Sequence, residues 1–230
     1  MAAASAPRPL HPRPVDAERP ERWGGDPFLL ADAVWRPACV TGWSAANHWG
    51  LTEQVFSTTV IRTTQRVRQS KQRLLDSDFV VSHTSPASMA WGLRREWRNG
   101  IPILMADPAR TVVDVLDDPR LSGGIRLATE ILAAYLQEGP PATLIEYAER
   151  LGNRTVFKRL GYLGEVLGAD PDLLASCEQR LSTGYPLLDP TQAGTGKRSR
   201  RSGLIANLAP APDTGGLGEG DQLRRVELSP

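Results

Sequence analysis

Apolar side chains recur at helical spacing through the second half of the chain. Residues 123–137 place Ala128, Ile131, Leu132, Tyr135 and Leu136 on one stripe, and residues 143–151 carry a second stripe. Residues 152–168 contain a third, and a fourth begins after Asp170. Steps of three and four residues bring side chains to one helix face, so each stripe predicts a helix that packs on the rest of the protein. The pattern therefore predicts a helical second half.

Shorter apolar runs with another pattern fill the first half. Residues 55–63 and 78–84 are rich in β-branched side chains, which favour strands. Residues 90–97 and 101–106 flank an Asn-Gly pair, which is typical of a two-residue hairpin turn. We therefore expect an α+β fold in which a small, mainly antiparallel sheet in the first half packs against the helical second half.

Two Asp-Pro pairs mark the starts of further helices. Asp26 and Asp107 are N-cap candidates, and each proline that follows suits the first helical position. A short helix capped by Thr41 and closed near Gly50 is expected between them. The first half thus combines strands with short helices.

Both ends of the chain have a composition that differs from the middle. Residues 1–25 contain five prolines and almost no large apolar side chain before Trp23, and residues 209–230 are rich in Gly, Pro and Asp. Such segments cannot offset the entropy lost on ordering, so we expect a disordered leader, a folded body over 26–208 and a disordered tail. No apolar run approaches the roughly 18 residues of a membrane span, which predicts a cytoplasmic protein without membrane contact.

Basic residues are concentrated in three stretches, although the net charge is only +1. Each stretch alone is typical of a solvated surface, but several phosphate contacts together would give a salt-dependent affinity for nucleic acid. The candidate nucleic-acid or partner-binding residues are Arg62, Arg66, Arg68, Arg150, Arg154, Lys158, Arg159, Lys197, Arg198, Arg200 and Arg201. Lys71 and Arg73 extend the first stretch.

The segment 152–168 is expected to form a helix with three faces. Val156, Leu160, Leu163 and Leu167 form a core stripe, and Gly161, Gly164 and Gly168 form a smooth strip that permits close approach of another backbone. Arg150, Arg154 and Lys158 are spaced by four and form a basic stripe. The first two faces serve the fold, and the third is the candidate for function.

Residues that commonly carry chemistry do not form a catalytic pattern. Cys39 and Cys177 belong to no Cys/His cluster and are expected to be reduced core residues. His11, His48 and His83 have no metal-ligand spacing. The Gly-rich segment 193–199 departs from the P-loop pattern.

Two further motifs allow a functional and a structural interpretation. Asp114, Asp117 and Asp118 could in principle bind a metal, but their spacing is also that of a solvated helix face, which we favour. Gly123 and Gly124 could cradle an anion, although a plain turn capped by Ser122 is the favoured interpretation. We therefore predict no catalytic residue, no metal site and no cofactor, and a protein that is not an enzyme.

Five segments resemble the C-terminal domain of AbiEi-type antitoxins of the abortive-infection toxin–antitoxin systems. The segments are SAANHWGLTE (44–53), ADPARTVVDVLDDPRLSGG (106–124), ERLGNRTVFKRLGYLGE (149–165), LLDP (187–190) and LIAN (204–207). The KRLGYL element is the most specific part, and the Pro-x-Arg-Thr helix start is second. The resemblance implies an antitoxin whose partner is a nucleotidyltransferase-like toxin.

The chain departs from the family pattern in three places. In the family an N-terminal winged helix-turn-helix supplies operator binding and autorepression, but only 25 residues precede Asp26 here, so that DNA-binding domain is expected to be absent. Gly164 stands where a larger apolar residue is expected, and no tryptophan precedes the LIAN segment.

Three hypotheses for the function follow. The favoured one is a non-catalytic antitoxin that neutralises its toxin. The alternative is a nucleic-acid-binding transcriptional regulator that acts through the basic stretches. A third, an endonuclease-like enzyme, would need the Asp114, Asp117 and Asp118 run to hold a metal.

Overall fold

The computed structural model describes residues 25–208; the predicted leader (apart from Gly25) and the predicted tail lie outside this range. The first half contains α2 (Pro27–Trp35), β1 (Ala38–Val40), α3 (Gly42–His48), β2 (Thr58–Thr63), β3 (Lys71–Leu74), β4 (Ser77–His83), η2 (Ser88–Ala90), β5 (Leu93–Arg98) and β6 (Ile101–Ala106). The second half contains α4 (Pro108–Asp117), η3 (Pro119–Ser122), α5 (Ile125–Glu138), α6 (Pro141–Leu151), α7 (Arg154–Leu167), α8 (Pro171–Glu178), β7 (Lys197–Ser199) and β8 (Leu204–Ala206). The α+β prediction is confirmed.

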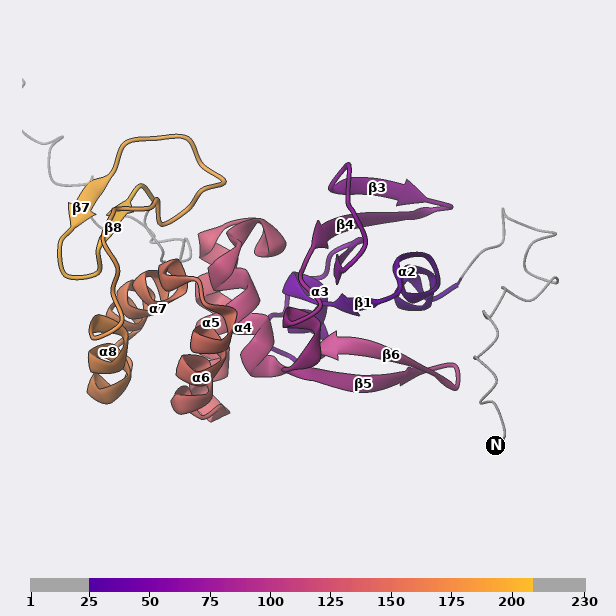
Figure 1. The fold of residues 1–230 in the computed structure, drawn as a ribbon, viewed down its shortest axis with the longest axis horizontal. Coiled ribbons are helices and arrows are strands. Elements are labelled where there is room, and N and C mark those ends of the chain that lie inside the picture. Colours follow the sequence, from indigo (N-terminus) through magenta and orange to yellow (C-terminus); the bar gives the residue numbers. More distant parts are fainter. Residues whose placement is uncertain (1–24, 209–230) are drawn as a thin grey trace, which may run out of the picture.

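Six strands of the first half form one mixed sheet in the order β3-β4-β2-β1-β6-β5. The pairs β1–β2, β3–β4 and β5–β6 are antiparallel, whereas β1–β6 and β2–β4 are parallel. In Figure 1 the sheet lies at one end of an elongated molecule and the helices α5 to α8 lie at the other. The short strands β1 and β3 were not predicted, because three or four residues carry too little periodicity to identify a strand.

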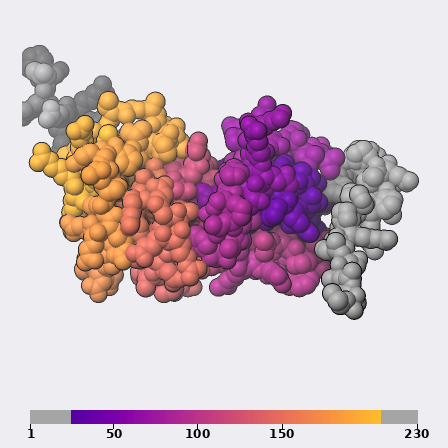
Figure 2. Space-filling model, viewed as in Figure 1, coloured from indigo at the N-terminus to yellow at the C-terminus, as the bar shows by residue number. Residues whose placement is uncertain are grey.

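Two apolar cores stabilise the two halves. One lies between the sheet and α2, where Leu30 and Trp35 pack on Ile61, Phe79 and Met105. The other joins α3 and β2 to all of the long helices and centres on α4, whose valines and Leu116 are fully buried. The space-filling view shows the two halves in continuous contact (Figure 2). Among residues 25–208, no helix is both long and apolar enough to cross a membrane.

Local signals at the helix starts behave as predicted. The Asp26 carboxylate accepts a hydrogen bond from the Phe28 amide (2.8 Å), and the Asp107 carboxylate accepts one from the Arg110 amide (2.8 Å). Thr41 is the N-cap of α3, but its hydroxyl makes no cap bond and turns to another partner. Aspartate caps are recognisable from sequence because the bond closes within two or three residues.

The glycine strip of α7 is confirmed at two of its three positions. An added Cβ at Gly161 would lie 3.2 Å from Cys177 Cβ of α8, and one at Gly164 would lie 3.0 Å from Leu174 Cδ2. Gly168 instead has a φ of +67° and ends the helix, with open space around it. Two glycines therefore let α8 pack closely on α7, and the third provides the left-handed turn after it.

Candidate functional site

Three of the predicted binding residues, Arg62, Lys158 and Arg159, are buried. The prediction of a surface role is wrong for these three, because their cationic groups bond inside the protein. The remaining predicted residues are exposed. The basic residues therefore divide into a buried set that bonds inside the protein and a set that lies at the surface.

Arg62 projects from β2 and joins the sheet to α4. Its guanidinium donates to Asp114 Oδ1 (2.8 Å) and to Asp117 Oδ2 (2.9 Å). Asp114 is fully buried and also accepts from Arg110 Nε (2.7 Å) and Thr41 Oγ1 (2.6 Å). Burial lowers the pKa of Arg62, but the carboxylates of Asp114 and Asp117 together outweigh it and raise the pKa. The result is a buried, charged joint between the two halves, in which Arg62 Nε has no hydrogen-bond partner among residues 25–208.

Arg110 extends this joint to η2 and to the segment that precedes β5. Its guanidinium lies 3.8 Å from the ring centroid of Trp91 and donates to the Ser88 carbonyl (3.0 Å). Tyr147 packs edge-on against the same Trp91 ring and donates its hydroxyl to Asp107 Oδ2 (2.9 Å). Burial raises the pKa of Tyr147 to about 12, with the bond to Asp107 adding to the shift. The Pro-x-Arg-Thr helix start is thus a structural element.

The acidic run at the end of α4 is not the solvated helix face that the spacing suggested. Asp114 is fully buried, so the interpretation is wrong for that residue. Asp117 accepts from Asn153 Nδ2 (2.8 Å), and Asp118 accepts from Arg120 Nε (2.8 Å). Across residues 25–208, no group of three or more His, Cys, Asp or Glu side chains is placed to hold a metal ion. The carboxylates of this run neutralise neighbouring cations and donors of the same chain.

Arg159 is held by backbone carbonyls from two segments. Its Nη1 donates to the carbonyls of Leu116 (2.7 Å) and Asp117 (2.9 Å), the last residues of α4. Its Nε and Nη2 donate to the carbonyls of Leu188 (3.0 Å) and Leu187 (3.1 Å). Burial lowers the pKa of this guanidinium, and nearby carboxylates offset part of the effect. A cation at a helix C-terminus interacts favourably with the helix dipole, so Arg159 ties α4 to the 187–188 segment.

Lys158 performs a similar function one residue earlier. Its side chain is 1% exposed, and its Nζ donates to the carbonyls of Gly184 (2.7 Å) and Thr183 (3.3 Å). Burial lowers the pKa of the ammonium group. The predicted basic stripe of Arg150, Arg154 and Lys158 is therefore interrupted, and only its first two members reach solvent.

The Gly-Gly turn before α5 contacts an anionic group, which is the Asp189 carboxylate of the same chain. Asp189 Oδ2 accepts from the Ile125 amide at the start of α5 (2.9 Å), and an added Cβ at Gly124 would lie 3.0 Å from the same oxygen. The Asn207 side chain exchanges two hydrogen bonds with the backbone of Asp189. The predicted Ser122 cap is wrong, because its hydroxyl donates to carbonyls of the turn. Asp189 of the LLDP segment thus caps α5, although it is 64 residues away in sequence, and Asn207 of the LIAN segment holds the Asp189 backbone.

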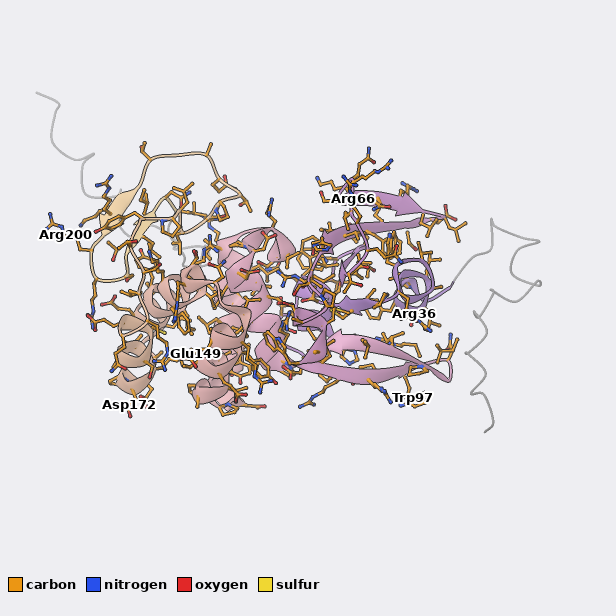
Figure 3. The ribbon with its side chains drawn as sticks, in the orientation of Figure 1. Arg36, Arg66, Trp97, Glu149, Asp172 and Arg200 are labelled. Carbon is orange, nitrogen blue, oxygen red and sulfur yellow. The ribbon has the colours of Figure 1, made fainter. Side chains whose placement is uncertain are left out.

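One exposed basic cluster lies at the sheet end of the molecule. Arg66 and Arg68 in the β2–β3 connection and Lys71 and Arg73 on β3 are all exposed. For none of these four does the described part of the chain contain a carboxylate within ion-pair distance. Figure 3 marks Arg66 beside β3 and β4, at the outer side of the sheet.

A second exposed cluster lies on the small β7–β8 sheet at the helical end. Lys197, Arg198 and Arg200 are exposed, and Arg198 lies over the Tyr185 ring at 5.4 Å. Arg201 differs, because it pairs with Glu165 of α7 (2.7 Å). Figure 3 shows Arg200 far from Arg66 along the long axis. The two clusters therefore do not form one continuous patch.

The middle stretch contributes two exposed arginines near the junction of α6 and α7. Arg150 pairs with Glu146 (3.0 Å) on the surface of α6. Arg154 begins α7 and lies 5.6 Å from the Phe157 ring. Glu146 neutralises part of the charge of Arg150, and Arg154 lies near an aromatic ring. These two arginines are therefore less available to an external phosphate than the two exposed clusters.

The β5–β6 hairpin carries exposed residues that sequence reasoning missed. Trp97, near the end of β5, is 68% exposed. Arg95, two residues earlier, is exposed as well. Arg95 and Trp97 are two residues apart on a strand and therefore share a face, so the polar neighbour Arg95 was the available signal that Trp97 is exposed. An exposed aromatic side chain therefore lies beside arginines on an outer strand of the sheet.

Comparisons with known proteins bear on the fold. No family model matches the chain, and no curated protein matches it. Among solved structures, the crystal structure of the RV2827C protein from Mycobacterium tuberculosis is similar, with a TM-score of 0.55 at 17% sequence identity. The match covers 79% of this chain and 68% of that one. At this identity the similarity establishes a shared fold and carries no function with it.

Proposed function

We propose that this chain is a non-catalytic antitoxin domain that neutralises a nucleotidyltransferase-like toxin in the cytoplasm. The observation that carries the proposal is the way in which the AbiEi-like segments meet. Arg159 of the KRLGYL element bonds to the end of α4 and to Leu187 and Leu188, and Asn207 bonds to Asp189. The most specific residues of the resemblance are thus joined in a single hydrogen-bonded unit, which supports a shared architecture with that family.

The use of the polar residues also supports a binding role. The buried carboxylate of Asp114 forms ion pairs inside the protein, and the buried carboxylate of Asp189 caps α5. The exposed features are cationic and aromatic surfaces on two ends of the molecule. Such surfaces suit recognition of a macromolecule, since arginine and tryptophan dominate binding energy at interfaces.

The test is neutralisation in cells. The proposal predicts a nucleotidyltransferase-like gene beside this one; that gene is expressed from an inducible promoter, and the full chain is supplied from a second plasmid. We expect toxin expression to stop growth and the full chain to restore it. The matched control is Leu160→Asp, which places a charge in the α7 core and removes the folded protein. A toxin that stays fully active in the presence of abundant, folded wild-type chain contradicts the proposal.

The second candidate function is nucleic-acid binding by the exposed basic clusters. The specific observation is that Arg66, Arg68, Lys197, Arg198 and Arg200 are exposed, and their charge is available for phosphates. Contacts of this kind recognise the backbone without sequence specificity. This activity is compatible with an antitoxin role, and its separate test is given in the Discussion.

A further inference from the structure

The strand β5 is the outermost strand of the sheet on the side away from β3. The strand order ends at β5, and within residues 25–208 it pairs with β6 alone. Figure 1 shows β5 along the lower edge of the sheet half. An outermost strand presents unpaired N–H and C=O groups that can pair with another strand.

The register identifies which backbone groups point outward. Arg98 and Ile101 flank the two-residue Asn-Gly turn, and the residues that flank such a turn bond to each other. The Asp107 amide donates to the Gly92 carbonyl (2.9 Å), which places the bonded pairs at the even-numbered residues of β5. The backbone groups of the odd-numbered residues, Arg95 among them, therefore point away from β6. Pro102, opposite Trp97, fits this assignment because proline has no N–H to donate.

The side chains of Arg95 and Trp97 are open to solvent, whereas Leu93 at the start of the strand packs against the sheet core. Arg95 and Trp97 lie two residues apart on one face of the strand, and 68% of Trp97 is exposed. Pro102 pairs with Trp97 and is exposed too. Figure 3 shows Trp97 at the lower border of the sheet half. Backbone groups available for pairing and side chains available for contact thus coincide at the same two residues.

The opposite face of β5 is already occupied. Arg94 lies over the Trp49 ring at 5.3 Å. Glu96 pairs with His48 (3.3 Å), and Arg98 lies over the Phe28 ring at 4.8 Å. These contacts anchor the strand, so an added segment would meet a rigid edge and not a loose loop.

The charged side chains of β5 indicate which kind of strand can pair with its outer edge. The strand carries three arginines and one glutamate, so a second copy of β5 is a poor partner. An antiparallel pair centred on Arg95 would set two Arg95 side chains against each other. A pair centred on Glu96 would oppose two glutamates and would set Arg94 against Arg98 of the other copy. Like charges directly opposite are destabilising, whereas acidic side chains in the added strand would pair with the arginines.

The other outer strand, β3, lacks the aromatic contact. Its outward residues are Lys71 and Arg73, because Val81 donates to the Ser70 carbonyl (2.7 Å) and places the bonded pairs at even-numbered residues. Long basic side chains without an apolar neighbour are a common protection of a sheet edge. The β3 edge therefore provides a control within the same sheet.

We propose that the outer edge of β5 binds an extended, acidic segment of a partner protein by β-strand addition. The added strand bonds to the backbone of Arg95 and Trp97, sets a carboxylate beside the Arg95 guanidinium and covers the Trp97 ring with an apolar side chain. The inference rests on strand geometry and does not require the partner to be a toxin.

The experiment uses the full chain and a capped heptapeptide probe. The probe has a central valine, glutamates two positions to either side of it, and serine or threonine elsewhere. Amide hydrogen exchange and amide NMR shifts are followed during the titration. We expect exchange at Arg95 and Trp97 to slow by about tenfold or more at saturation, because their amides gain partners. Exchange at Lys71 and Arg73 should not change.

Three variants test the contact at the β5 edge. Arg95→Pro removes the guanidinium together with an outward N–H that β6 does not use, so the fold is retained and binding is expected to be lost. Arg73→Pro makes the same change on the β3 edge and should bind as the wild type does. Trp97→Ala should weaken binding about fivefold or more through lost apolar contact. Thermal unfolding confirms that each variant is folded.

Three outcomes overturn the proposal. The first is unchanged exchange at Arg95 and Trp97 in the presence of saturating probe. The second is equal binding by a probe in which lysine replaces glutamate. The third is a parallel titration in which a single-stranded oligonucleotide, and not the peptide, perturbs the Arg95 and Trp97 amides, because the edge would then be a nucleic-acid contact.

Discussion

Single buried charges decide how the two halves of this protein are joined. Arg62 contacts Asp114 across 52 residues of sequence, and Arg159 reaches carbonyls 28 to 43 residues away. The sequence pattern assigned both arginines to the surface because charged residues are almost never fully buried unless paired. The partners that make burial possible lie far along the chain, so the local pattern contains no sign of them.

Removing the Asp114 carboxylate should strongly destabilise the fold. Asp114→Ala leaves Arg62 and Arg110 without their shared counter-ion in a buried site, so the free energy of unfolding should fall by about 3–5 kcal/mol. Urea unfolding followed by circular dichroism measures the change. The control is Glu146→Gln, which breaks the exposed pair with Arg150 and should change stability by less than about 1 kcal/mol. Equal effects of the two substitutions would contradict the buried-joint interpretation.

At the scale of elements, most helices and the hairpin were predictable because their signals are local. The Asp26 and Asp107 caps and the Asn-Gly turn each close within a few residues, and the structure contains all three. The Asp189 cap of α5 was not predictable, because the carboxylate arrives from 64 residues away. The α7–α8 contact was partly predictable, since Gly161 and Gly164 at helical spacing indicated close packing.

Filling the space at Gly164 should force α8 away from α7. Gly164→Val places side-chain atoms where Leu174 already lies 3.0 Å from an added Cβ, so we expect a loss of about 1–3 kcal/mol in unfolding free energy. Combining it with Leu174→Ala should recover part of the loss, because the smaller side chain makes room. Denaturant unfolding of both variants measures this. A double variant less stable than the sum of the two single changes would contradict the packing explanation.

At the scale of the whole molecule, the two exposed basic clusters lie at the sheet end and at the β7–β8 end, and Arg150 and Arg154 lie apart from both at the α6–α7 junction. Arg66 and Arg200 lie far apart along the long axis (Figure 3). The three basic stretches of the sequence therefore do not combine into one surface. A long nucleic acid could still touch both ends, whereas a short one would meet a single cluster.

The nucleic-acid hypothesis predicts a strong salt dependence. If about four phosphates are contacted, affinity for duplex DNA or RNA should fall by roughly a hundredfold between about 50 and 200 mM salt. Arg66→Glu with Arg68→Glu should weaken binding and reduce the salt slope, and the same holds for Arg198→Glu with Arg200→Glu. Fluorescence anisotropy with labelled duplexes measures both. The control is Arg150→Glu, whose charge is paired with Glu146. Binding that ignores salt and these substitutions would exclude a phosphate contact.

The sequence by itself determined the α+β class, the order of the main helices and strands and the aspartate caps, because periodicity and capping act between near neighbours. Only the tertiary structure decided which cations are exposed, which carboxylate caps α5 and which strand is left at the edge of the sheet. Those outcomes depend on groups that are brought together from distant parts of the chain. The stretch around Lys158 illustrates the difference: its helix was predictable, but its burial against Gly184 was decided by the loop that packs over it.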